Sequence, residues 1–181
     1  MARLASMIFA VTLTWSLAFL PYQLHAGLDG FEKIRLKNCP FEALMPSNYK
    51  IQKMSVPING EILNWERAEA ITDSEFLRHE CIRSPQPLSE VVNDDYMKQR
   101  LAMAVSSYGF VLTEMKTLDF SQGHAIEGLG IKTVKGRQGM IKTRIYIYGD
   151  FIAEFSAGTQ ANIFPTVNIS NFFKSINIKS Y

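Results

Sequence analysis

The sequence contains none of the short motifs that usually reveal an enzyme. It has no G-x-S-x-G nucleophile elbow, no H-E-x-x-H zinc motif, no phosphate-binding P-loop and no dinucleotide fingerprint. It also has no internal repeat and no low-complexity tract. The formal net charge of the 181 residues is only +2, so no strong overall field attracts polyanions. These absences disfavour nucleic-acid binding, and no motif predicts a catalytic residue, a cofactor or a metal site.

Charge is almost missing from the first 26 residues, where Arg3 is the only charged side chain. Residues 4–20 are apolar apart from Ser and Thr, and a small residue, Ala26, precedes the expected cleavage point. This pattern is typical of a secretory signal peptide. We therefore predict a signal peptide over residues 1–26, cleavage after Ala26, and one mature domain over residues 27–181 that is periplasmic or secreted. An uncleaved membrane anchor is the alternative.

Cysteine is scarce as well, since Cys39 and Cys81 are the only two in the chain. An exported protein meets an oxidising environment, which permits a disulfide bond. Neither cysteine has the CxxC spacing or the cluster of histidines that a redox or metal site would show. A structural disulfide between them is therefore favoured over a redox thiol or a metal pair.

The periodicity of apolar residues predicts mostly strands. Residues 72–82 are ambiguous, because Thr72 and Glu75 resemble a helix capping box whereas the following residues alternate as in a strand. We favour the strand. Consecutive strands with short connections indicate an antiparallel meander, and we expect a sheet of about six strands. The strand candidates are residues 41–45, 50–56, 61–70, 72–82, 110–118, 125–134, 140–148 and 151–157, with a strand stub after the last helix.

Two amphipathic helices are expected beside these strands. The first would be capped by Asp94 or Asp95 and would end at Gly109. The second would be capped by Thr166 or Asn168. Their apolar faces would consist of Met97, Leu101, Ala104, Val105 and Tyr108 in the first helix, and of Ile169, Phe172, Phe173 and Ile176 in the second.

The hairpin at Gly149-Asp150 shows how the helices and the sheet should combine. A two-residue loop pairs Tyr148 with Phe151 and Ile145 with Glu154. Neither face of this hairpin is cleanly polar, so we expect both faces of the sheet to be covered. The predicted class is therefore α+β, with an antiparallel sheet between helices.

At these residues the chain resembles the PsbP/Mog-type fold, including the DcrB-like bacterial periplasmic proteins. The resemblance is carried by an Arg-containing strand, Arg144-Ile-Tyr-Ile-Tyr-Gly, by the strand Phe151-Ile-Ala-Glu-Phe, and by the closing helix Phe172-Phe173-Lys174-Ser175-Ile176. Phe41-Glu-Ala-Leu-Met-Pro46 is similar to the opening strand of that fold. The resemblance implies an α/β/α sandwich and a binding or assembly role rather than catalysis. It carries no partner over to this chain.

A run of basic residues without an intervening acid is the best binding candidate. It lies between Gly128 and Gly149, and we expect its charges to cluster around one strand connection. Such a patch suits an anionic envelope component or an acidic protein, and any membrane contact would be peripheral. A solvated hairpin would explain the same charges without a ligand. The residues are Lys132, Lys135, Arg137, Lys142 and Arg144, and the Phe164-Pro165 loop is a second candidate.

Three functions remain open from the sequence. The first is an exported, non-catalytic binding or assembly protein of the cell envelope. The second is a small envelope hydrolase that uses His79 or His124 with nearby carboxylates. The third is a secretion or virulence accessory factor that docks one protein partner.

Overall fold

A computed structural model describes residues 30–37, 39–58, 61–85, 88 and 91–179, so the predicted signal peptide lies outside the described residues. This part of the chain forms ten strands, two α-helices and a short 3-10 helix. The helices are α1 (Asp94–Ser107), η2 (Ala161–Ile163) and α2 (Val167–Ser175). The strands are β1 (Phe31–Arg35), β2 (Phe41–Pro46), β3 (Lys50–Ile58), β4 (Glu61–Ile71), β5 (Glu75–Arg83), β6 (Val111–Thr117), β7 (His124–Val134), β8 (Arg137–Tyr148), β9 (Phe151–Gln160) and β10 (Asn177–Ile178).

The strands form two antiparallel sheets. The large sheet has seven strands in the order β3-β4-β5-β9-β8-β7-β6, and the small sheet has three in the order β1-β2-β10. The predicted α+β class and antiparallel pairing are confirmed, but the expected single sheet of about six strands was wrong. The small sheet was missed because it joins the first described strands to a two-residue strand near the C-terminus, which periodicity cannot detect.

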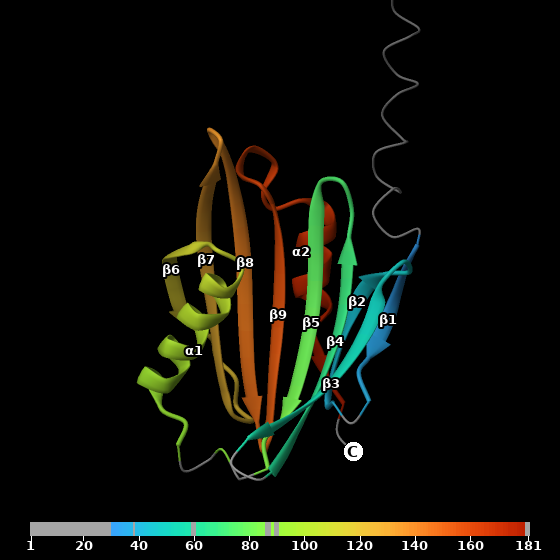
Figure 1. Cartoon of the computed structure of the whole chain (residues 1–181), viewed down its shortest axis with the longest axis vertical. Coiled ribbons are helices and arrows are strands. Elements are labelled where there is room, and N and C mark those ends of the chain that lie inside the picture. Colours follow the sequence, from blue (N-terminus) through green and yellow to red (C-terminus); the bar gives the residue numbers. More distant parts are fainter. Residues whose placement is uncertain (1–29, 38, 59–60, 86–87, 89–90, 180–181) are drawn as a thin grey trace, which may run out of the picture.

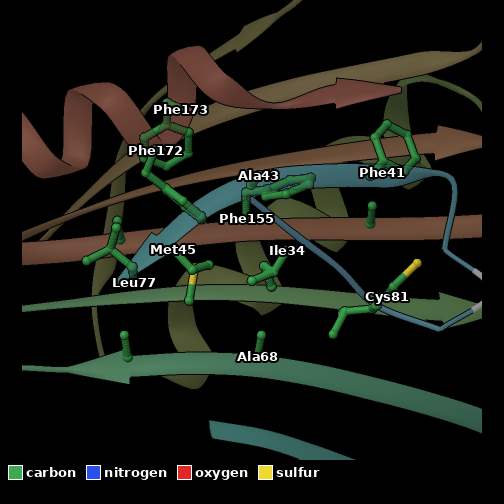
Figure 2. Close-up of a cluster of buried hydrophobic side chains, with 14 of the residues drawn as sticks. Ile34, Phe41, Ala43, Met45, Ala68, Leu77, Cys81, Phe155, Phe172 and Phe173 are labelled. Carbon is green, nitrogen blue, oxygen red and sulfur yellow. The ribbon is translucent and has the colours of Figure 1, made fainter. Parts of the chain in front are cut away.

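The large sheet is covered on both faces. We call the face that carries α1 the front face, as it is drawn in Figure 1, and the opposite one the back face. The helix α1 packs through Met97, Leu101 and Val105 on the front face of β7 and β8. The helix α2 and the small sheet pack on the back face, where Phe41 and Phe172 contact Phe155 (Figure 2). The expectation that neither face of the β8–β9 hairpin is free is therefore confirmed.

Two glycines let α1 approach β7 closely. A Cβ atom built at Gly128 would lie 2.8 Å from Leu101 Cδ2, and one built at Gly130 would lie 2.6 Å from Val105 Cγ1. Both distances are shorter than real Cβ contacts allow, so any larger side chain would push the helix away from the sheet.

Most local predictions agree with the structure. The β8–β9 hairpin has the predicted register, with Tyr148 opposite Phe151 and Ile145 opposite Glu154. Thr166 caps α2, because its hydroxyl accepts a hydrogen bond from the Ile169 amide at 3.1 Å.

The cap of α1 was predicted wrongly. Asn93 is the N-cap, and its side-chain oxygen accepts from the Tyr96 amide at 2.9 Å. Asp94 and Asp95 instead occupy the first turn, where their charge still favours the positive helix end.

The ambiguous segment after Thr72 forms the strand β5, so the prediction of a strand rather than a helix is confirmed. The Thr72 hydroxyl accepts from the Glu75 amide at 3.1 Å, and the Thr72 amide donates to the Glu75 carbonyl at 2.9 Å. The residues that resemble a helix capping box therefore close the β4–β5 turn.

The predicted disulfide is present. Cys39 and Cys81 are bonded, with their Cα atoms 6.1 Å apart. The bond joins the β1–β2 connection to β5, so it ties the small sheet to the large one. Among the described residues, no helix has the length and apolar character needed to span a membrane.

Candidate anion-binding groove

A groove of about 400 Å³ lies on the back face between β8 and α2. We call it the β8–α2 groove. Its lining combines apolar and polar side chains, and its cationic side chains come from two different elements. It is lined by Lys142, Arg144, Pro165, Ile169, Ser170, Phe173, Lys174 and Ile176.

Three cations surround one buried carboxylate, and two of these cations, Lys142 and Arg144, line the groove. Glu127 on β7 stands opposite Arg144 on β8 and opposite Lys116 on β6 in the strand register. Its Oε2 atom lies 3.1 Å from Lys142 Nζ and 3.0 Å from Arg144 Nε, and its Oε1 atom lies 3.1 Å from Lys116 Nζ. Only 5% of the Glu127 side chain is exposed. One negative charge therefore faces three positive charges.

The cations control the ionisation of this carboxyl. Burial alone would raise the pKa of Glu127, but hydrogen bonds from Arg144, Lys142 and Lys116 and the charge of Arg144 outweigh burial and lower that pKa. Burial likewise opposes the charge of Arg144, yet the contact with Glu127 raises the pKa of its guanidinium. Both groups therefore stay ionised at neutral pH.

Arg144 uses its hydrogen-bond donors within the protein. Besides Glu127, it donates from Nη1 to the Tyr146 hydroxyl at 3.3 Å and to the Phe173 carbonyl at 3.2 Å. It thereby fastens the end of α2 to the sheet. Lys142 and Lys174 have more freedom to meet a ligand, since Lys142 is partly exposed above the Phe173 ring, at 5.1 Å, and Lys174 is exposed in the last turn of α2.

The structure divides the five predicted binding residues. Lys142 and Arg144 face the back and line the groove. Lys132 instead lies toward the front, where its Nζ donates to the Tyr108 carbonyl at 3.2 Å. Lys135 and Arg137 are exposed at the tip of the β7–β8 hairpin. The five charges therefore do not form one cluster.

Sequence reasoning missed Lys174, which lines the groove, and Glu127 and Lys116, which are ion-paired beside it. Glu127 lies one residue before the acid-free run that defined the predicted patch. The signal that could have found it is the cross-strand pairing of Glu127 with Arg144. The predicted Phe164-Pro165 loop does reach this site, because Pro165 lines the groove.

The two described histidines lie in very different surroundings. His79 is fully buried, stacks on Phe155 with ring centroids 4.3 Å apart, and lies 3.8 Å from Cys39 Sγ. Burial lowers the pKa of His79 to about 3. His124 is exposed and shares a depression of only about 70 Å³ with Asp94. A His–carboxylate site would have to lie in that small depression.

The front face carries a second polar group beside α1. Glu80 and Glu154 stand opposite each other on β5 and β9. Arg67 donates to Glu80 at 2.6 Å, while Ser156 and Tyr108 donate to Glu154 at 3.0 and 3.3 Å. Burial and then the charge of Glu80 raise the pKa of Glu154. Its donors come from the sheet and from the end of α1, so the group connects the two.

Comparison with known proteins leaves the function open. No protein-family model matches the chain, and no curated protein matches it. Among solved structures the chain is similar to PA94 of Pseudomonas aeruginosa, a protein of unknown function, with a TM-score of 0.39 and 12% identity over 75% of this chain and 86% of that one. A likeness this weak assigns neither a family nor an activity.

Proposed function

We propose that this protein is an exported, non-catalytic binding or accessory protein of the cell envelope that holds an anionic group of its partner in the β8–α2 groove. The observation that carries the proposal is the excess of positive charge at Glu127, where three cations meet one carboxylate. A carboxylate or phosphate group between Lys142 and Lys174 would offset this excess. The disulfide between Cys39 and Cys81 supports the exported location.

The arrangement of layers supports a second part of the proposal. We infer an α/β/α sandwich of the PsbP/Mog type, with the small sheet as an added element beside α2. The support is that α1 and α2 pack on opposite faces of one antiparallel sheet. Accessory and partner-binding roles are what such an arrangement implies by resemblance.

The groove offers separate places for the apolar part and for the anionic group of a ligand. Phe173 and Ile169 provide an apolar floor, and Lys142 and Lys174 provide charge at its sides. Lysine presents a compact ammonium group with three donors, which suits a single carboxylate or phosphate. An acidic side chain or a phosphate ester next to an apolar group would therefore fit the groove better than a bare ion.

The proposal is tested with a double variant, Lys142→Ala with Lys174→Ala. Arg144 is left in place because it fastens α2 to the sheet. The first measurement is a titration with inorganic phosphate, followed through the amide NMR signals of Ile169 and Phe173, which line the groove and are unchanged in the variant. The second is crosslinking of the exported protein in its own envelope. We expect the variant to lose both the phosphate response and the captured partner.

The matched control is Lys98→Ala, which removes an exposed lysine from α1 on the other face. We expect the control to retain both responses. If the double variant captures the same partner as the wild type to the same extent, the groove is not the binding site.

A further inference from the structure

One end of the large sheet is built from three connections that are far apart in the sequence. They are the β4–β5 turn, the β7–β8 hairpin and the β9–α2 segment that contains η2, and they lie together at the top of Figure 1. We call this region the loop end. It lies apart from the basic lining of the β8–α2 groove, and it contains Lys135 and Arg137, the two predicted binding residues at the hairpin tip that do not line that groove.

Large aliphatic side chains project from each of these connections into solvent. Ile71 at the end of β4 is 66% exposed, and Val134 at the end of β7 is 51% exposed. In the third connection Ile163 is 47% exposed and Val167 is 66% exposed. Single exposed aliphatic residues are common on protein surfaces, but here each of three neighbouring connections carries at least one.

Hydrogen bonds hold two of these connections, the β4–β5 turn and the β9–α2 segment, in fixed positions relative to each other. Thr159 at the end of β9 donates to the Ser74 carbonyl of the β4–β5 turn at 2.6 Å. The buried carboxylate of Glu75 accepts from Thr166 and from Asn168 at the start of α2, both at 2.6 Å. Ile71, Ile163 and Val167 are therefore carried by segments that are bonded to each other, while Val134 lies on the β7–β8 hairpin.

The same end carries two exposed cations beside its apolar groups, together with one exposed acid, Asp73 of the β4–β5 turn. Lys135 and Gly136 both have positive φ, at 49° and 75°, which makes a tight hairpin turn that presents Lys135 at the tip. Arg137 follows and borders a depression of about 440 Å³. The depression is otherwise lined by Gln138, Gln160, Ala161 and Asn162, so its lining is polar and offers several amide groups.

We propose that the loop end is an interfacial membrane-binding surface, which places Ile71, Val134, Ile163 and Val167 in the headgroup region of an anionic lipid bilayer. Lys135 and Arg137 would then contact lipid phosphates, and the polar depression between the connections would stay hydrated. Apolar groups next to basic residues are the combination that binds such surfaces. This inference is independent of the proposed groove.

The spacing of the apolar groups favours a bilayer over a protein partner. A stable protein interface needs a continuous, well-packed apolar centre with a polar rim. The loop end has the reverse arrangement, since the polar depression beside Arg137 lies between apolar groups on separate connections. A fluid bilayer can accommodate separate side chains, because its headgroups rearrange around each of them.

The first test maps the contact directly. The full chain is mixed with vesicles of phosphatidylglycerol and phosphatidylcholine, and amide hydrogen exchange is followed by mass spectrometry. We expect slower exchange in residues 70–75, 133–138 and 160–167 with these vesicles, and a smaller effect with phosphatidylcholine alone. Exchange is measured separately for each segment, so binding of the apolar residues 4–20 to the vesicles would not by itself give the expected result. Unchanged exchange in all three segments would overturn the proposal.

The second test compares the two ends of one strand. Ile71 and Ile62 both lie on β4 and are both 66% exposed, but only Ile71 is at the loop end. We expect Ile71→Asp to weaken partitioning onto the anionic vesicles roughly tenfold, as for the loss of one buried aliphatic side chain. Ile62→Asp should leave it unchanged. Equal losses in the two variants would show that the loop end is not the contact.

The third test addresses charge. Replacing Lys135 and Arg137 by Gln should weaken binding to the anionic vesicles roughly fivefold per residue and should leave binding to phosphatidylcholine unchanged. Lys142→Ala with Lys174→Ala should not alter vesicle binding, so a failure of the groove proposal and a failure of this one are separable. Equal losses on both kinds of vesicle would contradict the role of the cations.

Discussion

The buried imidazole of His79 should make the protein sensitive to acid. Its ring is fully enclosed between Phe155 and the disulfide, and its Nδ1 atom has no hydrogen-bond partner. Burial lowers the pKa of His79 to about 3, from 6.5 for an ordinary histidine. Below pH 6.5 the unfolded chain therefore binds a proton that the folded protein does not bind until the pH falls to about 3. Stability must fall as the pH is lowered through this window.

The size of the effect follows from the two pKa values. At pH 7 both states are mostly neutral, so His79 affects the free energy of unfolding by only about 0.2 kcal/mol. At pH 5 the unfolded state is almost fully protonated at this site, and the loss reaches about 2 kcal/mol. For a domain of this size, a loss of about 2 kcal/mol lowers the Tm by about 4–8 °C.

The assay is urea unfolding of the wild type and of His79→Phe at pH 7 and pH 5. Phenylalanine keeps the flat ring against Phe155 but cannot be protonated, so other titrating groups cancel in the comparison. We expect the variant to gain about 2 kcal/mol relative to wild type between the two pH values. His124→Gln, at an exposed position, is the control and should follow the wild type. If wild type and His79→Phe lose stability in parallel, the imidazole is not buried as described.

Three further predictions concern stability. Glu154→Gln should gain stability relative to wild type as the pH rises above 4.5, because the raised pKa of Glu154 means that ionisation opposes folding; a difference that stays constant with pH, measured by chemical unfolding, would contradict this. Gly130→Ala should destabilise the protein by about 1–3 kcal/mol, because the added methyl group collides with Val105; an unchanged Tm would contradict this packing argument. Removing the disulfide by replacing Cys39 and Cys81 with Ala should cost up to about 4 kcal/mol in urea unfolding, and unchanged stability would show that the bond constrains little.

Local patterns predicted much of the large sheet and both helices. The Gly149-Asp150 loop determined the register of β8 and β9, and the spacing of Ile169, Phe172 and Phe173 identified the buried face of α2. These features depend on interactions between residues close in sequence, so one sequence contains enough information. The pairing of β10 with β2 depends on residues more than a hundred positions apart and has no local signal.

The candidate site was predicted less well, because the register of the β7–β8 hairpin was not used. The Lys135-Gly136 turn pairs Val134 with Arg137, and this register places Lys132 on the front face and Lys142 on the back face. Successive side chains of a strand point to opposite faces of the sheet. Basic residues that are close in the sequence were therefore grouped as one patch although they lie on different faces. The register of this hairpin, had it been worked out from the turn, would have separated them and brought Glu127 beside Arg144.

The small sheet has a consequence for the order in which the protein assembles. Its strands β1 and β2 are synthesised first, but they are completed by β10 and covered by α2, which are synthesised last. Ser175 accepts from the Leu44 amide at 2.8 Å, so the edge of β2 is closed only by the final residues. Until then β2 lacks its pairing with β10, although Cys39 and Cys81 are both already present in the chain. Once formed, the disulfide can hold the first strands against β5 before β10 and α2 are in place. A chain shortened before Phe172 should therefore accumulate as an oxidised but incompletely folded species.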